Sequence, residues 1–345
     1  MARISGFYHD IDPWELPPYW KAPVKKHRRA RFNDYTGRRI YMITVVKDEK
    51  TPILSSLAGN IRDTSDPVRV VLTPTGEMVN RCVSAIPSKF PHCSIIDRVV
   101  MPDHVHFIIF VRQKTDIHLG TIIGRFTGDC TRGFAEMLGL DDAIVKPPFF
   151  EPGYDDQILY RKGGLEVMKN YVRDNPRRLA LRRSDPKLFN RSLIITADGE
   201  RLHAYGNMFL LKNADRRAVR LSRKFSAEKT AQLHDLWQET CRNGGVLVSP
   251  FISPAEKEVR DMAIREGAPI ILVAPQGFRM REHAKGRAFD LCAEGRLLVI
   301  SRPGVYAGTG VLTRRECLEM NDLASTIAET DYNSLLFRRE DFIGL

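Results

Sequence analysis

"VVMPDHVHFIIFVR", residues 99–112, contains two apolar runs that are separated by Pro102 and Asp103, a pattern typical of a β-hairpin with a tight turn. In a strand, residues i and i+2 point to the same face, so His104 and His106 are predicted to lie side by side. Two such imidazoles could bind one metal ion. In an isolated His-x-His pair, however, one histidine is more often a core residue and the other an edge residue with a hydrogen bond. The hairpin by itself leaves both interpretations open.

A second polar pair follows on a helix that is predicted to begin near Leu165. Tyr171 and Asn175 are spaced i, i+4 and therefore share one helix face. The amide oxygen of Asn175 suits a third ligand for a hard divalent cation such as Mg²⁺ or Mn²⁺, and the phenol of Tyr171 is a potential nucleophile. Pro176 lacks a backbone donor and clashes with the preceding turn, so we expect it to end or kink this helix.

The segments around these pairs predict an α+β sandwich, in which an antiparallel sheet has its helices packed on one face. Hydrophobic periodicity and β-branched composition give the order of elements. The predicted elements are strands at 38–48 and 68–72, a helix at 75–90, strands at 93–101 and 104–112, a helix at 119–138, a strand within 147–160, and the helix from 165.

The C-terminal part has a different pattern, in which short continuous apolar strands alternate with helices. Such runs are typical of a parallel sheet that is covered on both faces, and they predict a small Rossmann-like α/β domain. Ser253 and Pro254 provide an N-cap and a first helical residue. The predicted elements are helices at 226–244, 253–267 and 279–295, and strands at 245–250, 268–275 and 296–301.

At 345 residues, the chain is long enough for two domains. The predicted division is a basic and aromatic N-terminal arm (1–35), a first domain (36–190), a linker (191–206) and a second domain (207–345). Composition is 43% hydrophobic and 28% charged, typical of a soluble protein, with no apolar stretch near the roughly 18 residues of a membrane span. Six cysteines without a C-x-x-C pair indicate reduced thiols, and no signal-peptide h-region is present, so we expect a cytoplasmic protein.

The net charge of +11 and a pI near 9.4 point to a polyanionic partner such as nucleic acid. The charge is concentrated in the arm at 21–39 and at 177–187, on either side of the two polar pairs. Solvated basic surfaces or a disordered tail would have the same composition. Our candidates for contacts with a nucleic-acid backbone are Lys25, Lys26, Arg28, Arg29, Arg31, Arg173, Arg177, Arg178, Arg182 and Arg183.

Two motifs carry a resemblance to a known family. "MPDHVHFIIF" resembles the histidine-hydrophobic-histidine motif of the single-tyrosine HUH nucleases, and "YVRDNPRRLA" resembles their tyrosine-helix motif. In this order they are similar to the IS200-like transposase domain, most closely the branch associated with repetitive extragenic palindromes (REP). The resemblance covers roughly residues 36–190. It departs from the family pattern at Asp103, where Asn is common, and at Arg177, where Val is common.

The resemblance implies a ferredoxin-like sheet and assigns a role to each residue of the two motifs. His104, His106 and Asn175 would be the metal ligands, Asp103 would support them from a second layer, and Tyr171 would be the nucleophile. The activity implied is metal-dependent cleavage and joining of single-stranded or hairpin DNA through a 5′-phosphotyrosine. The site could be assembled within one chain or across a homodimer, and the sequence leaves both arrangements open.

The second domain resembles, more weakly, the Rossmann-like domains of DprA-type DNA-processing proteins, through "GGVLVSPFIS", "IILVAPQGF" and "GRLLVIS". Its ligands are expected beyond the carboxyl ends of the strands, where the amides that follow Ser253 could hold a phosphate. No G-x-G-x-x-G or Walker loop supports a nucleotide cofactor. Two other functions stay open for the whole chain: a metal-dependent phosphoesterase in which Tyr171 is only structural, and a DNA-binding regulator without catalysis.

Overall fold

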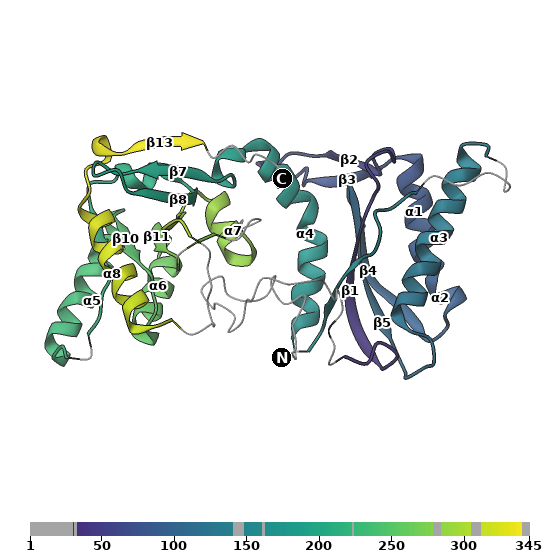
Figure 1. Ribbon diagram of the computed structural model, residues 1–345, viewed down its shortest axis with the longest axis horizontal. Helices are drawn as coiled ribbons and strands as arrows, with labels where there is room; N and C mark the ends of the chain where they lie inside the picture. The colour runs from purple at the N-terminus through teal and green to yellow at the C-terminus, as the bar shows by residue number, and fades with distance from the viewer. Residues whose placement is uncertain are drawn as a thin grey trace. The chain divides into compact units, whose positions relative to one another are not determined.

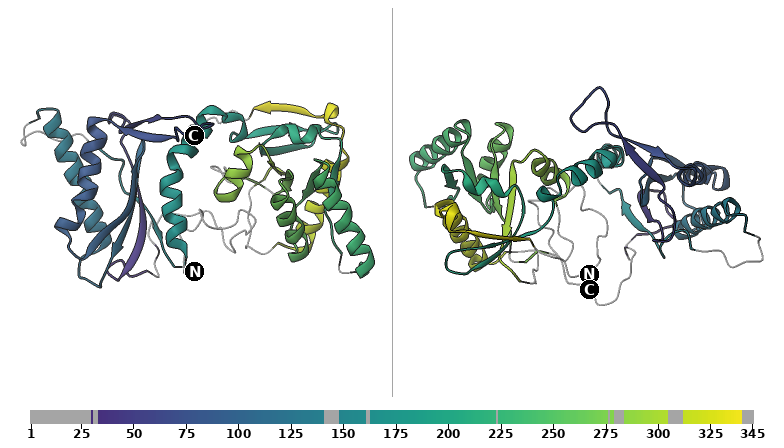
Figure 2. Two further views of the ribbon diagram at one scale, coloured as in Figure 1. Left: turned by 180° about the vertical axis from the view of Figure 1, so that it is seen from behind. Right: turned by 90° about the horizontal axis from the view of Figure 1, so that it is seen from above.

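The structure is a computed structural model, and its described residues fall into two compact units. Unit 1 ends at Arg183 and unit 2 begins at Ser184, so each unit is treated by itself. Figures 1 and 2 show the ribbon from three sides. The described residues are 30, 33–140, 148–160, 163–222, 224–275, 277–278, 284–304 and 312–339.

Unit 1 is built on a four-stranded antiparallel sheet with strand order β4-β5-β1-β6. Its elements follow one another as β1, α1, β4, β5, α3 and β6, which is the β-α-β-β-α-β order of ferredoxin-like folds. The turn between β4 and β5 is closed by a hydrogen bond from Met101 N to His104 O of 2.8 Å, so the predicted hairpin is confirmed. The strands are β1 (Arg39–Val46), β4 (Cys93–Val100), β5 (His104–Val111) and β6 (Asp155–Ile158).

One face of this sheet carries the larger core of unit 1. Val105, Phe107 and Ile109 point from β5 into a buried cluster with residues of α1 and α3. The rings of Phe107 and Phe126 meet there edge to face, with centroids 5.4 Å apart. The helices of this layer are α1 (Pro74–Ser84), α2 (Ile86–Lys89) and α3 (Leu119–Met137), close to the predicted ranges.

The opposite face of the sheet is covered by α4 (Gly164–Ser184), which Figure 1 shows on the other side of β1, β4 and β5 from α1 and α3. A second buried cluster joins Met42 and Ile108 of the sheet to Met168 and Val172 of α4. The expectation that all helices pack on one face was therefore wrong. The reason lies in the second half of β5, where Ile108 and Phe110 are apolar at even positions as well as Ile109 and Val111 at odd ones, so the strand has two faces to bury.

Pro176 lies inside α4 and does not end it, contrary to our expectation. A proline inside a helix costs about 3 kcal/mol, because it removes one donor and crowds the preceding turn. Here the burial of Met168 and Val172 against the sheet offsets that cost, and Pro176 is itself buried. Tyr171 and Asn175, which precede the proline, and Arg182, which follows it, consequently lie on one continuous helix.

A separate two-stranded sheet flanks unit 1. The strand predicted at 68–72 is confirmed as β3, but it pairs with β2 rather than with the four-stranded sheet. Thr73 then caps α1 by accepting a hydrogen bond from Gly76 N. The two strands are β2 (Ser55–Ala58) and β3 (Arg69–Leu72).

Unit 2 contains a seven-stranded mixed sheet with order β13-β7-β8-β12-β11-β10-β9. Strands β9 to β12 are parallel, as predicted for this part, whereas β8, β7 and β13 are antiparallel. The predicted linker 191–206 instead forms β7 and β8, two strands of this sheet. The strands are β7 (Ser192–Ile195), β8 (Arg201–Gly206), β9 (Arg216–Ala218), β10 (Val246–Ser249), β11 (Ile270–Val273), β12 (Leu297–Ser301) and β13 (Leu336–Arg339).

Helices alternate with the parallel strands of unit 2, as the sequence predicted. Met320 and Ile327 of α8 pack against Val248 and Ile271 in the core of one face. Within the described parts of the chain, no helix is both long and apolar enough to span a bilayer. The helices are α5 (Ala227–Arg242), α6 (Pro254–Arg265), α7 (Gly286–Ala293) and α8 (Arg314–Glu329), with short 3-10 helices η1 (Pro186–Leu188), η2 (Met208–Lys212) and η3 (Tyr332–Ser334).

Candidate active site

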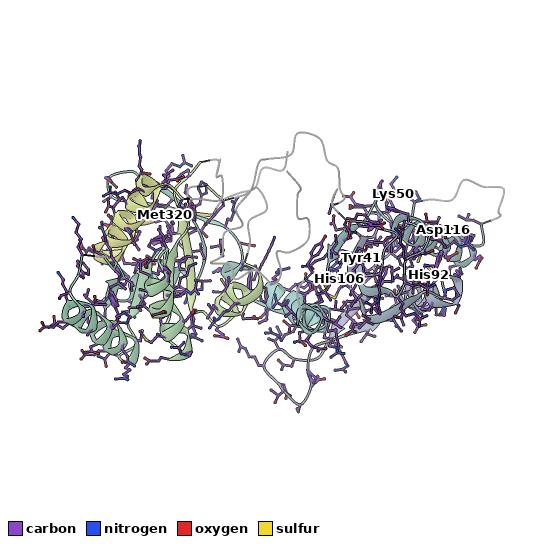
Figure 3. All side chains as sticks on the ribbon, turned by 90° about the horizontal axis from the view of Figure 1, so that it is seen from below. Tyr41, Lys50, His92, His106, Asp116 and Met320 are labelled. Atoms are coloured by element: carbon purple, nitrogen blue, oxygen red, sulfur yellow. The ribbon has the colours of Figure 1, made fainter. Side chains whose placement is uncertain are left out.

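The two histidines of the hairpin lie on the α4 face of the sheet. They alternate along β5 with Val105 and Phe107, which face α1 and α3, and they share their face with Ile108. His106 is only 5% exposed, and Figure 3 labels it within unit 1. The predicted placement of both imidazoles on one face is confirmed.

The two imidazoles meet through their outer nitrogens. Nε2 of His104 and Nε2 of His106 are 3.0 Å apart, and the rings are nearly perpendicular. Two neighbouring ligands that are each about 2.1 Å from one octahedral ion would be about 3 Å apart. The pair therefore fits a shared metal ion. Among the described residues, no group of three or more His, Cys, Asp or Glu is placed to hold a metal ion.

The Nδ1 atoms of the two histidines have different partners. Nδ1 of His104 lies 2.7 Å from Oδ1 of Asp103, and this hydrogen bond holds the pKa of the Asp103 carboxyl below its usual value. Nδ1 of His106 lies 2.8 Å from Oγ1 of Thr44, which is directly opposite it on β1. Hydrogen bonds of this kind fix the orientation of metal-binding imidazoles. Sequence reasoning missed Thr44, because only the register of β1 and β5 brings it to His106.

The helix α4 brings Tyr171 to the same place. Its ring packs edge to face on the ring of His106, with centroids 5.6 Å apart. Burial raises the pKa of the Tyr171 phenol, while a hydrogen bond from Asn175 and the charges of Arg182 and Arg178 oppose that shift. The guanidinium of Arg178 also lies over the phenol ring, 5.8 Å from its centroid. The phenol is thus held protonated at neutral pH beside cationic groups that would favour its charged form.

Asn175 is buried one turn beyond Tyr171, 8% exposed. Its Nδ2 donates a hydrogen bond of 3.0 Å to the backbone oxygen of Tyr171, which fixes the side chain against its own helix. Because that bond uses the amide nitrogen, it leaves the amide oxygen Oδ1 as the atom of Asn175 that could bind a hard metal ion.

Three of the arginines predicted to contact DNA are held in ion pairs on α4. Arg173 pairs with Asp97 of β4 at 2.7 Å, and Arg177 and Arg178 share Asp174 at 2.5 and 2.7 Å. The guanidiniums of Arg173 and Arg177 are exposed, and exposed pairs contribute at most about 1 kcal/mol, so these two side chains are oriented by their partners but can still contact another anion. Arg182 and Arg183 are exposed near the end of the helix. Lys25, Lys26, Arg28, Arg29 and Arg31 lie outside the described residues.

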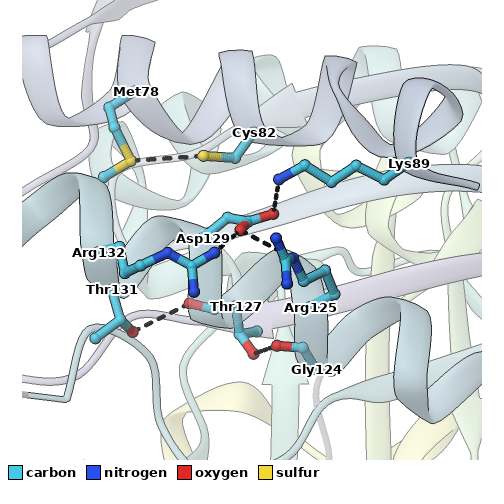
Figure 4. A network of polar contacts seen from close by, with 9 residues as sticks. All are labelled: Met78, Cys82, Lys89, Gly124, Arg125, Thr127, Asp129, Thr131 and Arg132. Atoms are coloured by element: carbon cyan, nitrogen blue, oxygen red, sulfur yellow. Dashed lines mark hydrogen bonds and ion pairs between the residues drawn. The ribbon is translucent and has the colours of Figure 1, made fainter.

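A further basic group, which the sequence did not single out, lies on the outer side of α3. The carboxylate of Asp129 is shared by Lys89 of α2, at 2.5 Å, by Arg125, at 3.3 Å, and by Arg132 (Figure 4). One anion among three cations leaves a local excess of positive charge. Helical spacing joins Asp129 to Arg125 and Arg132, but the contribution of Lys89 comes from tertiary structure.

In unit 2, a buried carboxylate at the start of α6 binds backbone amides that precede the helix. The carboxylate of Glu256, 3% exposed, accepts hydrogen bonds from the backbone N–H groups of Leu221, Ile252 and Ser253. Ser253 is the N-cap of α6, as predicted, and it forms a capping box with Glu256. Of the amides that follow Ser253, that of Glu256 already donates to the Ser253 hydroxyl, so a phosphate at this helix start would compete with the capping box and would face the Glu256 carboxylate.

None of the curated proteins matches the chain. A solved structure of the REP-associated tyrosine transposase bound to a REP hairpin is 16% identical, with 44% of this chain and 72% of that chain covered and a TM-score of 0.31. A crystal structure of a candidate transposase from Deinococcus radiodurans R1 is 12% identical, with 42% of this chain and 95% of that chain covered and a TM-score of 0.26.

The family model described as "Transposase IS200 like" matches residues 70–175. The matched segment contains His104, His106 and Tyr171, and it ends at Asn175. The match covers the β4–β5 hairpin, helices α1 to α3, and the part of α4 that ends at Asn175. Residues 70–175 therefore carry the signature of the IS200-like transposases, which confirms the resemblance that the two motifs indicated.

Proposed function

We propose that unit 1 is a metal-dependent single-stranded DNA endonuclease and strand transferase, a transposase that acts through a covalent 5′-phosphotyrosine on Tyr171. The observation that carries the proposal is the meeting of a phenol and an imidazole pair on one face of the sheet. The Tyr171 ring contacts the His106 ring, and the outer nitrogens of His106 and His104 converge to 3.0 Å. The match of residues 70–175 to the IS200-like transposase family supports the same activity.

In the proposed reaction, the phenol oxygen of Tyr171 attacks the scissile phosphorus and its proton is lost. The bond from phosphorus to the 3′-oxygen breaks, and the 3′-oxygen leaves as a hydroxyl after it takes up a proton. The 5′ end is left on the enzyme as a phosphotyrosine, so the phosphodiester energy is retained. Attack by another 3′-hydroxyl reverses the step and joins a strand without ATP.

His104, His106 and Asn175 are the proposed ligands of a Mg²⁺ or Mn²⁺ ion, and Asp103 orients His104 through its hydrogen bond. Such an ion supplies Lewis-acid polarisation of the scissile phosphate. The protein's own contribution is to hold the phenol beside the imidazoles. Arg178 and Arg182 add positive charge near the phenol, where it favours loss of the phenolic proton.

The proposed substrate is single-stranded or hairpin DNA. The phenol of Tyr171 is packed against the sheet and does not project from the surface. A flexible single strand can bend its backbone to such a phenol, whereas a continuous duplex is too stiff to do so. The arginines at 173, 177, 178, 182 and 183 are proposed to contact the backbone beside the site, together with the basic N-terminal arm. The Asp129 group on α3 adds positive charge on the opposite helical layer of unit 1.

Four finer points remain predictions. They are the treatment of the two units as separate domains with a basic N-terminal arm, a Rossmann-like unit 2 related to DprA-type proteins that binds DNA, a homodimer, and a cytoplasmic location. For unit 2, the parallel order of β9 to β12 supports the α/β assignment. The antiparallel strands β7, β8 and β13 make its sheet larger and more mixed than a small parallel layer.

The test uses a labelled single-stranded hairpin oligonucleotide, incubated with the full chain and Mn²⁺ and analysed under denaturing conditions. We expect a protein–DNA adduct that is lost in Tyr171→Phe. The matched control is Tyr160→Phe, which changes an exposed tyrosine of the same unit and should leave the adduct unaltered. An adduct that survives in Tyr171→Phe contradicts the proposal. Cleavage without an adduct indicates a phosphoesterase in which Tyr171 is structural, and binding alone indicates a DNA-binding regulator.

A further inference from the structure

Four side chains of the site form one continuous chain of polar contacts. Oγ1 of Thr44 lies 2.8 Å from Nδ1 of His106, Nε2 of His106 lies 3.0 Å from Nε2 of His104, and Nδ1 of His104 lies 2.7 Å from Oδ1 of Asp103. The outer members differ in chemistry. An ionised carboxylate can only accept a hydrogen bond, whereas a hydroxyl can donate or accept.

Asp103 therefore sets the direction of every bond in the chain when both histidines are neutral. Because the carboxylate accepts, Nδ1 of His104 carries the proton and Nε2 of His104 has the lone pair. The 3.0 Å contact then requires that Nε2 of His106 donate. Nδ1 of His106 is left with a lone pair, so the Thr44 hydroxyl must donate to it.

A metal ion that is bound by both histidines demands another arrangement. Both Nε2 atoms must then offer lone pairs, which His104 already does and His106 does not. The proton of His106 has to move from Nε2 to Nδ1, and the partner of Nδ1 has to change from donor to acceptor. The hydroxyl of Thr44, which lies 2.8 Å from Nδ1 of His106, can make that change by rotating about its C–O bond.

We propose that Thr44 is a positioning residue that permits His106 to exchange tautomers, donating to Nδ1 in the metal-free protein and accepting from Nδ1 when the ion is bound. The inference rests on the metal site proposed above. The position of Thr44 suits the role, because cross-strand pairing holds it directly opposite His106 and its β-branched side chain is restricted at χ1. Thr44 is also partly exposed, so solvent can accept its hydroxyl proton in the second state.

The first experiment measures Mn²⁺ binding to the full chain in the absence of DNA, by calorimetry or by the electron paramagnetic resonance signal of free Mn²⁺. Thr44→Val keeps the shape of the side chain and removes the hydroxyl, and we expect it to weaken binding by about 10- to 100-fold. Thr44→Ser keeps the hydroxyl and should bind like the wild type. Thr121→Val, at an exposed position on α3, is the matched control and should also be unchanged.

The outcomes separate the inference from the function on which it rests. If the wild type binds Mn²⁺ and Thr44→Val binds it equally well, the role of Thr44 is overturned and the metal site stands. If the wild type does not bind Mn²⁺, the proposed metal site fails, and the inference fails with it. Equal weakening in Thr44→Val and Thr44→Ser also contradicts the proposal, because a hydroxyl is then not what matters.

A second measurement needs no variant. Nitrogen-15 NMR of the imidazoles distinguishes the two neutral tautomers in the wild-type chain. Without metal we expect the proton of His104 on Nδ1 and that of His106 on Nε2; with diamagnetic Mg²⁺ we expect the His106 proton on Nδ1. A His106 proton that is already on Nδ1 without metal overturns the proposed exchange.

Discussion

The rings of His106 and Tyr171 pack edge to face, with their centroids 5.6 Å apart, although one residue lies on β5 and the other on α4. The contact places a potential nucleophile beside a potential metal ligand. It depends on α4 crossing the sheet face that carries the even-numbered residues of β5, where Ile108 and Met168 provide the apolar packing. The same packing withdraws the phenol from water and so raises its pKa.

The raised pKa of Tyr171 predicts a rate of adduct formation that increases with pH. The pKa lies above the usual value of about 10, so the phenol is protonated at neutral pH and each unit of added pH exposes more phenolate. We expect the single-turnover rate with Mg²⁺ to rise on the order of tenfold per unit between pH 7 and 9, without a plateau. Because the phenol of Tyr171 holds its proton more tightly in the folded chain than in the unfolded chain, this group stabilises the folded state. That stabilisation is present below about pH 10, the usual pKa of tyrosine, and is lost above it. The titration of Tyr171 therefore does not unfold the protein between pH 7 and 9. A plateau below pH 9 would show that another group takes the proton.

Removal of either histidine should abolish metal binding rather than folding. His104→Ala and His106→Ala each delete one of two converging nitrogens, and we expect Mn²⁺ affinity to fall by at least about 100-fold, beyond the usual effect of a supporting hydrogen bond. The control is His234→Ala in unit 2, which should bind like the wild type. Circular dichroism checks that the variants are folded. Unchanged affinity in both variants would eliminate the pair as the metal site.

The sequence predicted the hairpin and the two polar pairs, but not the side of the sheet on which they meet. The alternation of His104 and His106 with Val105 and Phe107 placed both imidazoles on one face. Ile108 and Phe110 make the even positions of β5 apolar beyond the histidines, which is the signal of a strand covered on both faces and predicts a helix on the histidine side. Our expectation of helices on one face ignored that signal.

Thr44 marks the part of the site that single-sequence reasoning does not reach. A threonine in a β-branched strand is ordinary by composition. Only the pairing of Thr44 with His106 across β1 and β5 gives it a role, and register is a tertiary property. The same holds for Lys89, which joins Asp129 from another helix.

Pro176→Ala should stabilise the protein. The substitution restores the missing backbone donor toward Val172 and removes the clash of the ring, and a helix-interior proline costs about 3 kcal/mol relative to alanine. Loss of the buried ring offsets about 1 kcal/mol of that gain, so we expect the free energy of unfolding to rise by about 1–2 kcal/mol. The matched control is Pro186→Ala at the first position of η1, where proline is favourable and no gain is expected. Destabilisation by Pro176→Ala would show that the packing of the ring outweighs the backbone.

The sequence did not single out Glu256, and its buried position gives the last prediction. Glu256→Ala leaves the amides of Leu221, Ile252 and Ser253 without their acceptor. Each unsatisfied buried donor costs about 1–3 kcal/mol, and some of these amides will reach water, so we expect unit 2 to lose about 2–4 kcal/mol.

Urea unfolding is followed by tryptophan fluorescence in a chain that carries Trp14→Phe and Trp20→Phe, so that the signal comes from Trp237, which is buried in unit 2. Glu256→Gln keeps one acceptor oxygen and should fall between Glu256→Ala and the wild type. Glu258→Ala changes an exposed glutamate of the same helix and should shift the midpoint little. If Glu256→Ala and Glu258→Ala prove equally mild, the carboxylate does not hold the start of α6, and an external anion could replace it there.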